Sequence, residues 1–343
     1  MRALTIVFTL LAAIALSAQE QDPFTETIYV TRYALDVRVA DSQGKAIDDL
    51  TLDDFIVTIG GKPAHVEGAN WIPQGHRIKV PDAPIEGDID TLPTEPDVRS
   101  VVILIQTDFG RFSARVLGQM KFNYLAKDIL TMFGPYDRVA VLSHDSHLKF
   151  RHDFTSDRDA VRKAIEESIA INKPPPPAPA TVGQSLSPFL DRDEMKRINH
   201  AEEALLFIAK ALEQLEGEKL IILAGWGIGD LRGRAGVKLR NEWNDAMAIL
   251  HREHIPVVTL GTGVVGGQLT YGLKATADAT GGFYAGTQDF ESHALTRLEA
   301  VLAGHYALTL RVEDDLEPGQ YPLEVRITRK DAIAHAPPYI VHQ

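Results

Sequence analysis

Two kinds of hydrophobic pattern divide the chain. Near both ends, apolar residues alternate with polar ones, which is typical of strands with one buried face. In the middle, short uninterrupted apolar runs are separated by segments whose apolar residues recur every three or four positions. The alternating segments are residues 33–39, 55–59, 306–312 and 321–327. We therefore predict antiparallel strands at both ends and a different architecture between them.

The apolar runs in the middle predict strands that are buried on both faces. They are residues 101–105, 139–142, 220–223 and 257–260. Residues 200–215 and 240–254 carry an apolar stripe at helical spacing. Residues 113–133 are apolar on two sides, which predicts a helix covered by its neighbours. Strands and helices alternate, so we predict an α/β fold with a doubly wound, mostly parallel sheet and helices on both faces.

Proline-rich stretches indicate the boundaries between these regions. Residues 73–97 hold five prolines and six acidic side chains, which predicts a linker. Residues 172–192 hold six further prolines and predict a long loop. We expect an α/β domain over residues 98–303. Two β segments, residues 24–72 and 304–343, are expected to pack together as a small antiparallel sandwich-like region.

The first residues have the pattern of a secretory signal. Arg2 is followed by an apolar run from Ala3 to Leu16 and then by two small residues. The run is too short to cross a bilayer of about 30 Å comfortably. We predict a signal peptide over residues 1–18 and no transmembrane segment after its removal, with an uncleaved anchor as the alternative. The protein is expected to be secreted, or to be periplasmic or elsewhere in the cell envelope.

Composition excludes several classes of function. The 343 residues are 45% apolar and 24% charged, with a formal net charge of −12. This acidic excess argues against a nucleic-acid partner and against an anionic lipid surface. The chain has no cysteine, which excludes disulfides, thiolate zinc sites and cysteine nucleophiles.

Candidate binding residues follow the strands of the predicted parallel sheet. In open α/β sheets, ligands bind beyond the carboxyl ends of the strands, near the point where the strand order reverses. A tryptophan in a Gly-rich loop at this edge is either a packed lid or an exposed anchor for a partner. We expect polar contacts or loop ordering from five residues: Thr107, Asp108, Arg111, Trp226 and Asp230.

Three stretches of the chain, taken in order, resemble a known family. They are GKAIDDLTLDDFIVTIGGKPAHV (residues 44–66), PYDRVAVLSHDSHLKFRHDFTSDRDAVRKAI (135–165) and ADATGGFYAGTQDFESHALTRLEAVLAGHYALTLRV (277–312). Their order is similar to that of the exported bacterial proteins related to von Willebrand factor A domains. The resemblance runs from about residue 28 to residue 341. It implies a von Willebrand factor A-like, Rossmann-like fold, a role in protein binding, and Mg²⁺ at a metal-ion-dependent adhesion site.

The metal motif of that family is incomplete in this sequence. The family's first strand ends in Asp-x-Ser-x-Ser, and its fourth strand ends in Asp. In one register Gln106 stands at the first Asp, with Asp108 and Gly110 at the two Ser positions and Ala224 or Gly225 at the last Asp. In the alternative register Asp108 comes first, and Gly110 and Phe112 stand where hydroxyls belong. Magnesium requires oxygen ligands, so we expect a degenerate site with no metal and no other cofactor. Asp108 is expected to cap the following helix instead.

These observations favour a non-catalytic, adhesion-type module that binds a protein partner at the cell surface or in the periplasm. A first alternative is a transition-metal hydrolase that uses His144, His147 and His152. A second is a structural envelope-assembly subunit whose strands pair with other chains. An exposed edge strand at residues 306–312 or 321–327 would favour this second alternative.

Overall fold

The computed structural model describes residues 31–79, 93–107, 113–168, 184–232, 236–263, 267–287, 291–312 and 316–342. The predicted signal at residues 1–18 lies outside these segments, as do Asp108 and Arg111. The same holds for residues 80–92 of the predicted linker and 172–183 of the predicted loop. Within the described segments, no helix is both long enough and apolar enough to cross a membrane.

The middle of the chain forms a six-stranded sheet with the order β13-β12-β9-β6-β7-β8. Five of its strands are parallel, and only β8 runs antiparallel, beside β7. All eight residues of β6 are buried, as the uninterrupted apolar run predicts. The strands are β6 (Arg99–Gln106), β7 (Asp137–His144), β8 (Leu148–Thr155), β9 (Lys219–Gly225), β12 (Val257–Gly261) and β13 (Tyr284–Gly286).

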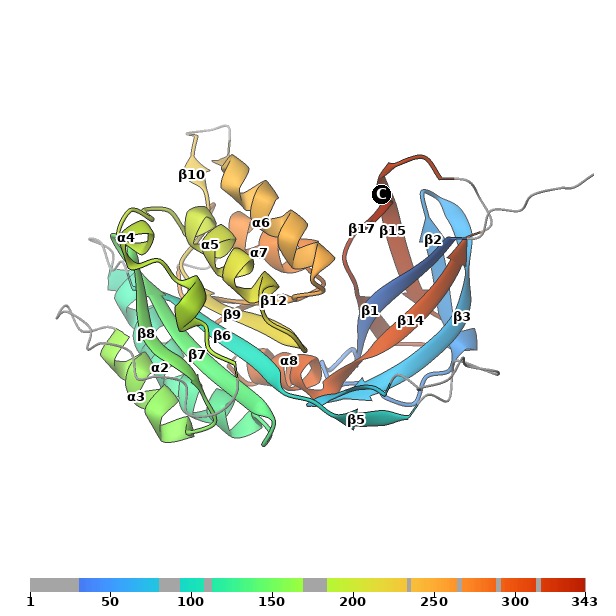
Figure 1. The fold of residues 1–343 in the computed structure, drawn as a ribbon, viewed down its shortest axis with the longest axis horizontal. Helices are drawn as coiled ribbons and strands as arrows, with labels where there is room; N and C mark the ends of the chain where they lie inside the picture. Colours follow the sequence, from blue (N-terminus) through green and yellow to red (C-terminus); the bar gives the residue numbers. More distant parts are fainter. Residues whose placement is uncertain are drawn as a thin grey trace, which may run out of the picture.

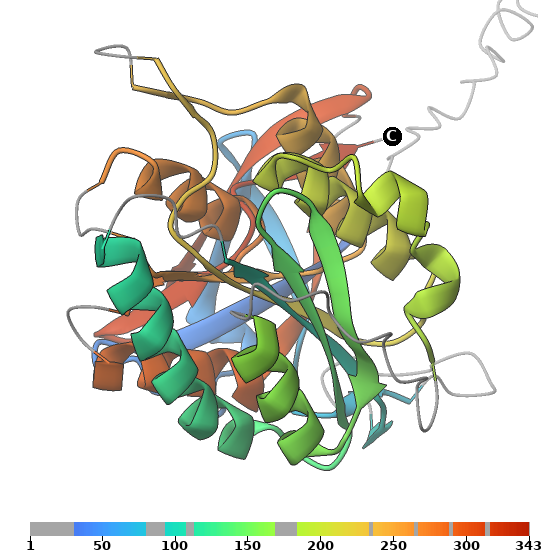
Figure 2. The ribbon, with the colours of Figure 1, turned by 90° about the vertical axis from the view of Figure 1, so that its left-hand side faces the viewer.

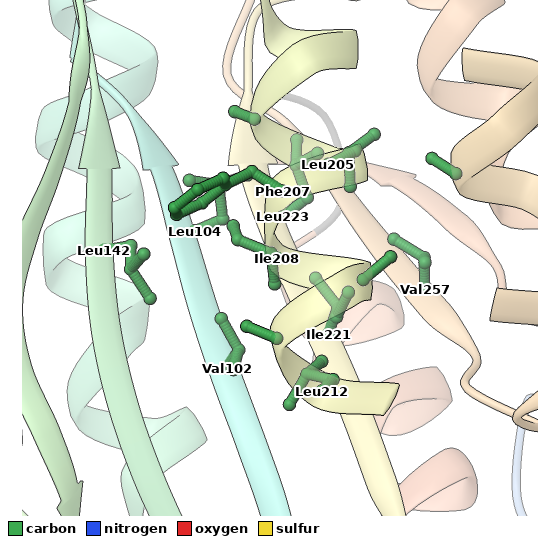
Figure 3. Close-up of a cluster of buried hydrophobic side chains, with 14 of the residues drawn as sticks. Val102, Leu104, Leu142, Leu205, Phe207, Ile208, Leu212, Ile221, Leu223 and Val257 are labelled. Atoms are coloured by element: carbon green, nitrogen blue, oxygen red, sulfur yellow. The ribbon is translucent and has the colours of Figure 1, made fainter. Parts of the chain in front are cut away.

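Helices cover both faces of this sheet (Figure 1). One face carries α5 (Ala201–Glu213), α6 (Asn241–Arg252) and α7 (Thr270–Ala279), and the other carries α2 (Ser113–Met132), α3 (Arg158–Ser168) and α8 (Glu291–Ala303). Successive side chains of a strand point to opposite faces. Val102 and Leu104 therefore pack under α5 (Figure 3), whereas Val101 and Ile103 pack with α2, α3 and α8. Each such side chain stabilises the fold by about 1.5–3 kcal/mol.

The two ends of the chain form a second, antiparallel sheet with the order β16-β1-β14-β3-β2-β15-β17. Strand β14 from the C-terminal segment lies between β1 and β3 from the N-terminal segment. Their inward residues, among them Leu35, Val57 and Leu308, share one core. The strands are β1 (Thr31–Asp41), β2 (Phe55–Ile59), β3 (Lys62–Pro73), β14 (Gly304–Val312), β15 (Gly319–Ile327), β16 (Ala332–His335) and β17 (Tyr339–His342).

Short elements complete the described chain. Strands β4 and β5 form a two-stranded ladder at the two ends of the predicted linker, and β10 and β11 form a second ladder. At the described end of the predicted proline-rich loop, Leu186 is buried in the core beneath α5. The short elements are η1 (Leu52–Asp54), β4 (His76–Ile78), β5 (Thr94–Pro96), η3 (Ser187–Phe189), α4 (Arg192–Met195), β10 (Asp230–Leu231) and β11 (Val237–Lys238).

Of the two positions expected for an exposed edge strand, residues 306–312 lie inside the sheet and residues 321–327 lie inside it only in part. Residues 306–312 belong to β14, which pairs with β1 and β3. Residues 321–327 belong to β15, which pairs with β2 and β17. Strand β14 is therefore covered on both sides, whereas β17 lies beside β15 only from Gly319 to Pro322, and no described strand pairs with that side of Glu324–Ile327.

Buried charges join the two sheets at the amino end of the parallel strands. Arg99 begins β6 and forms an ion pair of 2.8 Å with Asp137 at the start of β7, and both side chains are at most 1% exposed. The guanidinium also donates to the carbonyl of Leu302 (3.0 Å), and Gln74 donates to Asp137 (2.7 Å). These bonds tie β6 and β7 to the residue that follows β3 and to the end of α8, just before β14.

A second cluster lies beside this ion pair. The carboxylate of Asp36 in β1 lies 3.3 Å from His254 and 3.6 Å from His305. Burial raises the pKa of Asp36, but the two imidazoles outweigh it and hold the pKa well below its usual range. The hydrogen bond to Asp36 raises the pKa of His254, whereas burial lowers the pKa of His305. The cluster therefore links the second sheet to the loop that precedes β12.

Candidate functional site

The carboxyl ends of β6, β9 and β12 lie side by side, as the sequence predicts for a ligand-binding edge. Ile105 of β6 pairs with Ala224 of β9, and Gly225 pairs with Gly261 of β12. The residues that follow these strands therefore meet at one edge of the sheet. We call this the carboxyl edge.

Gln106 organises the carboxyl edge through its side chain. The buried amide oxygen accepts hydrogen bonds from the backbone N–H groups of Trp226 (2.9 Å) and Gly227 (3.2 Å), and Nε2 donates to the carbonyl of Gly227 (2.8 Å). All three bonds cross from β6 to the loop after β9. The Gln106 side chain thus holds a neighbouring loop in place.

Two glycines let the backbone close tightly around this edge. A Cβ atom on Gly225 would lie 2.1 Å from the amide oxygen of Gln106, so the position leaves no room for a carboxylate side chain. A Cβ atom on Gly118 would lie 1.7 Å from the carbonyl oxygen of Thr262. Helix α2 therefore packs directly against the backbone that follows β12.

The predicted binding residues separate into two places. The backbone N–H of Thr107 donates to the carbonyl of His144 (2.8 Å), and its buried hydroxyl has no hydrogen-bond partner among the described residues. Trp226 is half-buried and held next to Thr107 by Gln106. Asp230 instead lies in β10, which projects away from the sheet (Figure 1), and forms an ion pair with Arg240 (3.1 Å). The predictions for Asp108 and Arg111 fall outside the described residues.

The three histidines of the hydrolase alternative do not form a metal site. His144 is buried opposite Leu148 in the β7–β8 ladder, and burial lowers its pKa. Nδ1 of His147 lies 3.1 Å from the hydroxyl of Ser146, and Nδ1 of His152 lies 2.6 Å from the carbonyl oxygen of Asp153. Within the described segments, no group of three or more His, Asp or Glu side chains is placed to hold a metal. The prediction of a three-histidine centre is therefore wrong, because strand geometry separates these residues.

One face of α2 is apolar and exposed, although the sequence predicts that neighbours cover both apolar sides. The inner side, including Phe122 and Ile129, is buried against the sheet. On the outer side, Leu117, Met120 and Tyr124 are 60%, 62% and 68% exposed. We call these three residues the α2 face. Figure 2 shows α2 along the outside of the molecule, beside α3. The α2 face begins at the carboxyl edge, because Gly118 touches Thr262 there.

Sequence reasoning missed both Gln106 and the α2 face as functional elements. The polar end of an otherwise apolar strand is a signal for Gln106, and an apolar residue pattern on both sides of a helix is a signal for α2. Neither signal indicates which loop Gln106 contacts or which side of α2 faces solvent. That depends on contacts between residues about 120 positions apart, such as Gln106 and Gly227.

Comparison with known proteins gives structural neighbours only. No family model and no curated protein matches the chain. The conserved protein BatB from Bacteroides thetaiotaomicron is 16% identical over 59% of this chain and 98% of its own (TM-score 0.38). The vWF domain of the pilus tip protein Mfa5 from Porphyromonas gingivalis is 13% identical over 60% of this chain and 95% of its own (TM-score 0.38). A von Willebrand factor type A protein from Catenulispora acidiphila is 9% identical over 93% and 74% (TM-score 0.42).

Similarity at this level concerns the fold and not the partner or the chemistry. Two of these three structures, those from Porphyromonas gingivalis and Catenulispora acidiphila, are described as von Willebrand factor A domains.

Proposed function

We propose that this protein is an exported, non-catalytic, adhesion-type module that binds a protein partner at the cell surface or in the periplasm. The partner contacts the carboxyl edge of the parallel sheet and the adjoining α2 face. The observation that carries the proposal is the exposure of Leu117, Met120 and Tyr124 on one helix face next to that edge.

The α2 face supports a partner with an apolar surface. Its three side chains follow one another at intervals of three and four residues, so they form one continuous stripe. A contiguous exposed apolar patch of this kind marks an interaction site, because covering it gains about 25 cal/mol per Å². Lys121 and Lys127 are exposed on the same helix, and the ammonium of Lys127 lies 5.8 Å from the ring centre of Tyr124. These cations favour a partner with carboxylates around its apolar surface.

A degenerate, metal-free edge is the second part of the proposal. The related family implies Mg²⁺ here, and magnesium demands near-ideal octahedral coordination by oxygen. The Gln106 oxygen already accepts two N–H bonds, and Gly225 supplies no side-chain oxygen. The described residues therefore do not fit the ion. Recognition rests instead on shape and apolar contact, with Thr107 and Trp226 at the rim and Asp108 and Arg111 as predicted neighbours.

Affinity capture from the native cell envelope tests this function. The bait is the purified protein, compared with Leu117→Ser/Tyr124→Ser and with Ile333→Ser, which alters a similarly exposed residue on β16. We expect the same partner with the unsubstituted protein and with Ile333→Ser, with or without a chelator, and its loss with the double substitution. Trp226→Ala is expected to weaken capture. Capture that survives the double substitution, or that needs a divalent ion, would contradict the proposal.

A further inference from the structure

The antiparallel sheet is open between β1 and β17. Residues Thr31–Val37 of β1 pair with β14 on one side, and β16 occupies the other side only from Arg38 to Asp41. Strand β17 pairs with β15 and, among the described strands, with no other. Residues 332–342 start beside β1 and, after Pro337 and Pro338, continue beside β15. As a result, one edge of β1 and one edge of β17 have no neighbouring strand among the described residues (Figure 1).

A cavity of about 480 Å³ occupies this opening. Four consecutive residues of β1 (33–36) and three of β17 (339–341) line it, and the last turns of α6 form its third wall. Because consecutive residues of both strands reach the cavity, backbone groups of both edges border it. The hydroxyl of Tyr33 meets Nδ1 of His342 at 2.9 Å across the opening. We call this space the β1–β17 slot.

The backbone of β17 turns hydrogen-bonding groups into the slot. The N–H of Leu323 donates to the carbonyl of Pro338 (2.9 Å), so residue 338 faces β15. In an antiparallel ladder the bonded residues alternate, so Tyr339 and Val341 face the other way. The carbonyl of Tyr339 indeed meets Nε2 of His251 on α6 at 2.6 Å. The N–H and C=O of Val341 are therefore directed toward the slot.

The slot is also lined by a buried guanidinium with one unsatisfied N–H. Arg38 lines it, is only 6% exposed, and its Nε has no hydrogen-bond partner among the described residues. Glu218 remains 4.0 Å from its Nη2, and Asp36 is engaged by two histidines. A buried donor without a partner is costly, and a carboxylate supplied by a ligand would satisfy it.

We propose that the β1–β17 slot binds an extended segment of a partner protein as an additional β-strand. Such a strand hydrogen-bonds to both open edges and presents its side chains alternately to the two faces. Side chains directed inward meet Tyr33, Leu35 and Ile340 of the sheet core. Side chains directed toward α6 meet Arg38. The segment that fits therefore alternates apolar and acidic residues. The slot lies at the opposite end of the parallel sheet from the α2 face, so this inference stands apart from the proposed function.

A peptide titration tests the slot. The probe is a fluorescent, capped peptide of alternating valine and glutamate, and its control alternates valine and lysine. Fluorescence anisotropy with the full chain should give saturable binding of the glutamate peptide, at least about tenfold tighter than the lysine peptide. Equal binding of both peptides, or no saturable binding, would overturn the proposal.

Two substitutions locate the binding within the slot. Val341→Pro removes an N–H that the β15 ladder does not use, a change that edge strands tolerate, and should abolish binding without altering the melting temperature. Val341→Thr keeps the N–H and should bind as before. Arg38→Gln should remove the preference for glutamate over lysine. Binding by Val341→Pro at unchanged affinity would show that no strand is added. So would a Val341 amide whose hydrogen exchange is unchanged by saturating peptide.

Discussion

At the carboxyl end of the parallel sheet, one amide side chain and several glycines bring the loops together, whereas at the amino end a network of buried charges does so. Gln106 makes three hydrogen bonds to the loop after β9. At the other end, Arg99 and Asp137 form a fully buried ion pair. Asp36, His254 and His305 extend the charged region to the second sheet.

This difference shows that the titratable groups of the described residues gather where the two sheets join and not at the carboxyl edge. A cluster of His, Asp and Arg side chains is commonly a sign of a functional site. Here such a cluster lies where two sheets from different parts of the sequence join. Among the described residues, the groups that shape the carboxyl edge are the neutral amide of Gln106 and the glycines.

The largest effect is expected at the buried ion pair. Asp137→Asn removes the nearer carboxylate of the buried Arg99 guanidinium and leaves only Glu218 at 3.7 Å, so it should lower the free energy of unfolding by about 3 kcal/mol. Urea denaturation measures it. Asp193→Asn removes an exposed ion pair with Lys196 and should change stability by no more than about 0.5 kcal/mol. Equal effects of the two substitutions would show that the buried pair does not stabilise the fold.

A smaller effect is expected at Gln106. Gln106→Ala leaves the N–H groups of Trp226 and Gly227 and one carbonyl without partners, which should cost about 2–3 kcal/mol. Gln106→Glu keeps both acceptor bonds but places a buried carboxylate oxygen against the carbonyl of Gly227, so it should also destabilise the protein, and more at neutral than at acidic pH. Thermal unfolding, with Trp226 fluorescence as a local probe, distinguishes the two. If both variants were as stable as the unsubstituted protein, Gln106 would not organise the edge.

Acidification should weaken the joint between the sheets by about 1–2 kcal/mol. Burial, with smaller contributions from Arg297 and Arg38, lowers the pKa of His335 from 6.5 to about 4. The unfolded chain therefore takes up this proton at a higher pH than the folded one, and stability falls as the pH drops from 6.5 toward 4. His335→Gln should flatten that part of the stability profile.

A second histidine, His254, should show the opposite dependence of stability on pH. The hydrogen bond between His254 and Asp36 raises the pKa of His254 above its value in the unfolded chain. The stability that it contributes is present below pH 6.5 and is lost as the pH rises through the folded pKa. His254→Gln should therefore destabilise the protein at acidic pH and have less effect at alkaline pH. Parallel profiles for the two histidine variants would contradict both assignments.

The smallest effect on stability is expected at the α2 face. Leu117→Ser/Tyr124→Ser alters exposed side chains, so each change should shift the free energy of unfolding by no more than about 0.5 kcal/mol. Urea denaturation measures this directly. A loss of several kcal/mol would mean that the α2 face is part of the fold rather than a surface for a partner.

The fold was predictable where the pattern is local. The uninterrupted runs at residues 101–105 and 220–223 become strands β6 and β9, both buried along their whole length. The alternation at residues 306–312 identifies a strand, but it does not reveal that this strand lies between β1 and β3. Pairing of strands from opposite ends of a chain depends on contacts that no local pattern records.

The candidate site was predictable in position and not in chemistry. Strand ends place Thr107 and Trp226 at one edge, and the structure holds them next to each other through Gln106. Helix α2 was expected to be covered on both apolar sides. The spacing of its apolar residues shows that two sides are apolar, but it does not show which side faces the sheet and which faces solvent. The histidines do not form a metal centre, because the antiparallel pairing places His144 opposite Leu148 and His152 opposite Val141, at different positions along the ladder.

Calorimetric titration of Mg²⁺ into the purified protein tests most directly whether Gln106, rather than an ion, organises the carboxyl edge. We expect no saturable binding at millimolar magnesium, either for the protein as it is or for Asp108→Ala. Saturable binding of one ion per chain that is lost in Asp108→Ala would contradict this interpretation and place a metal at the edge.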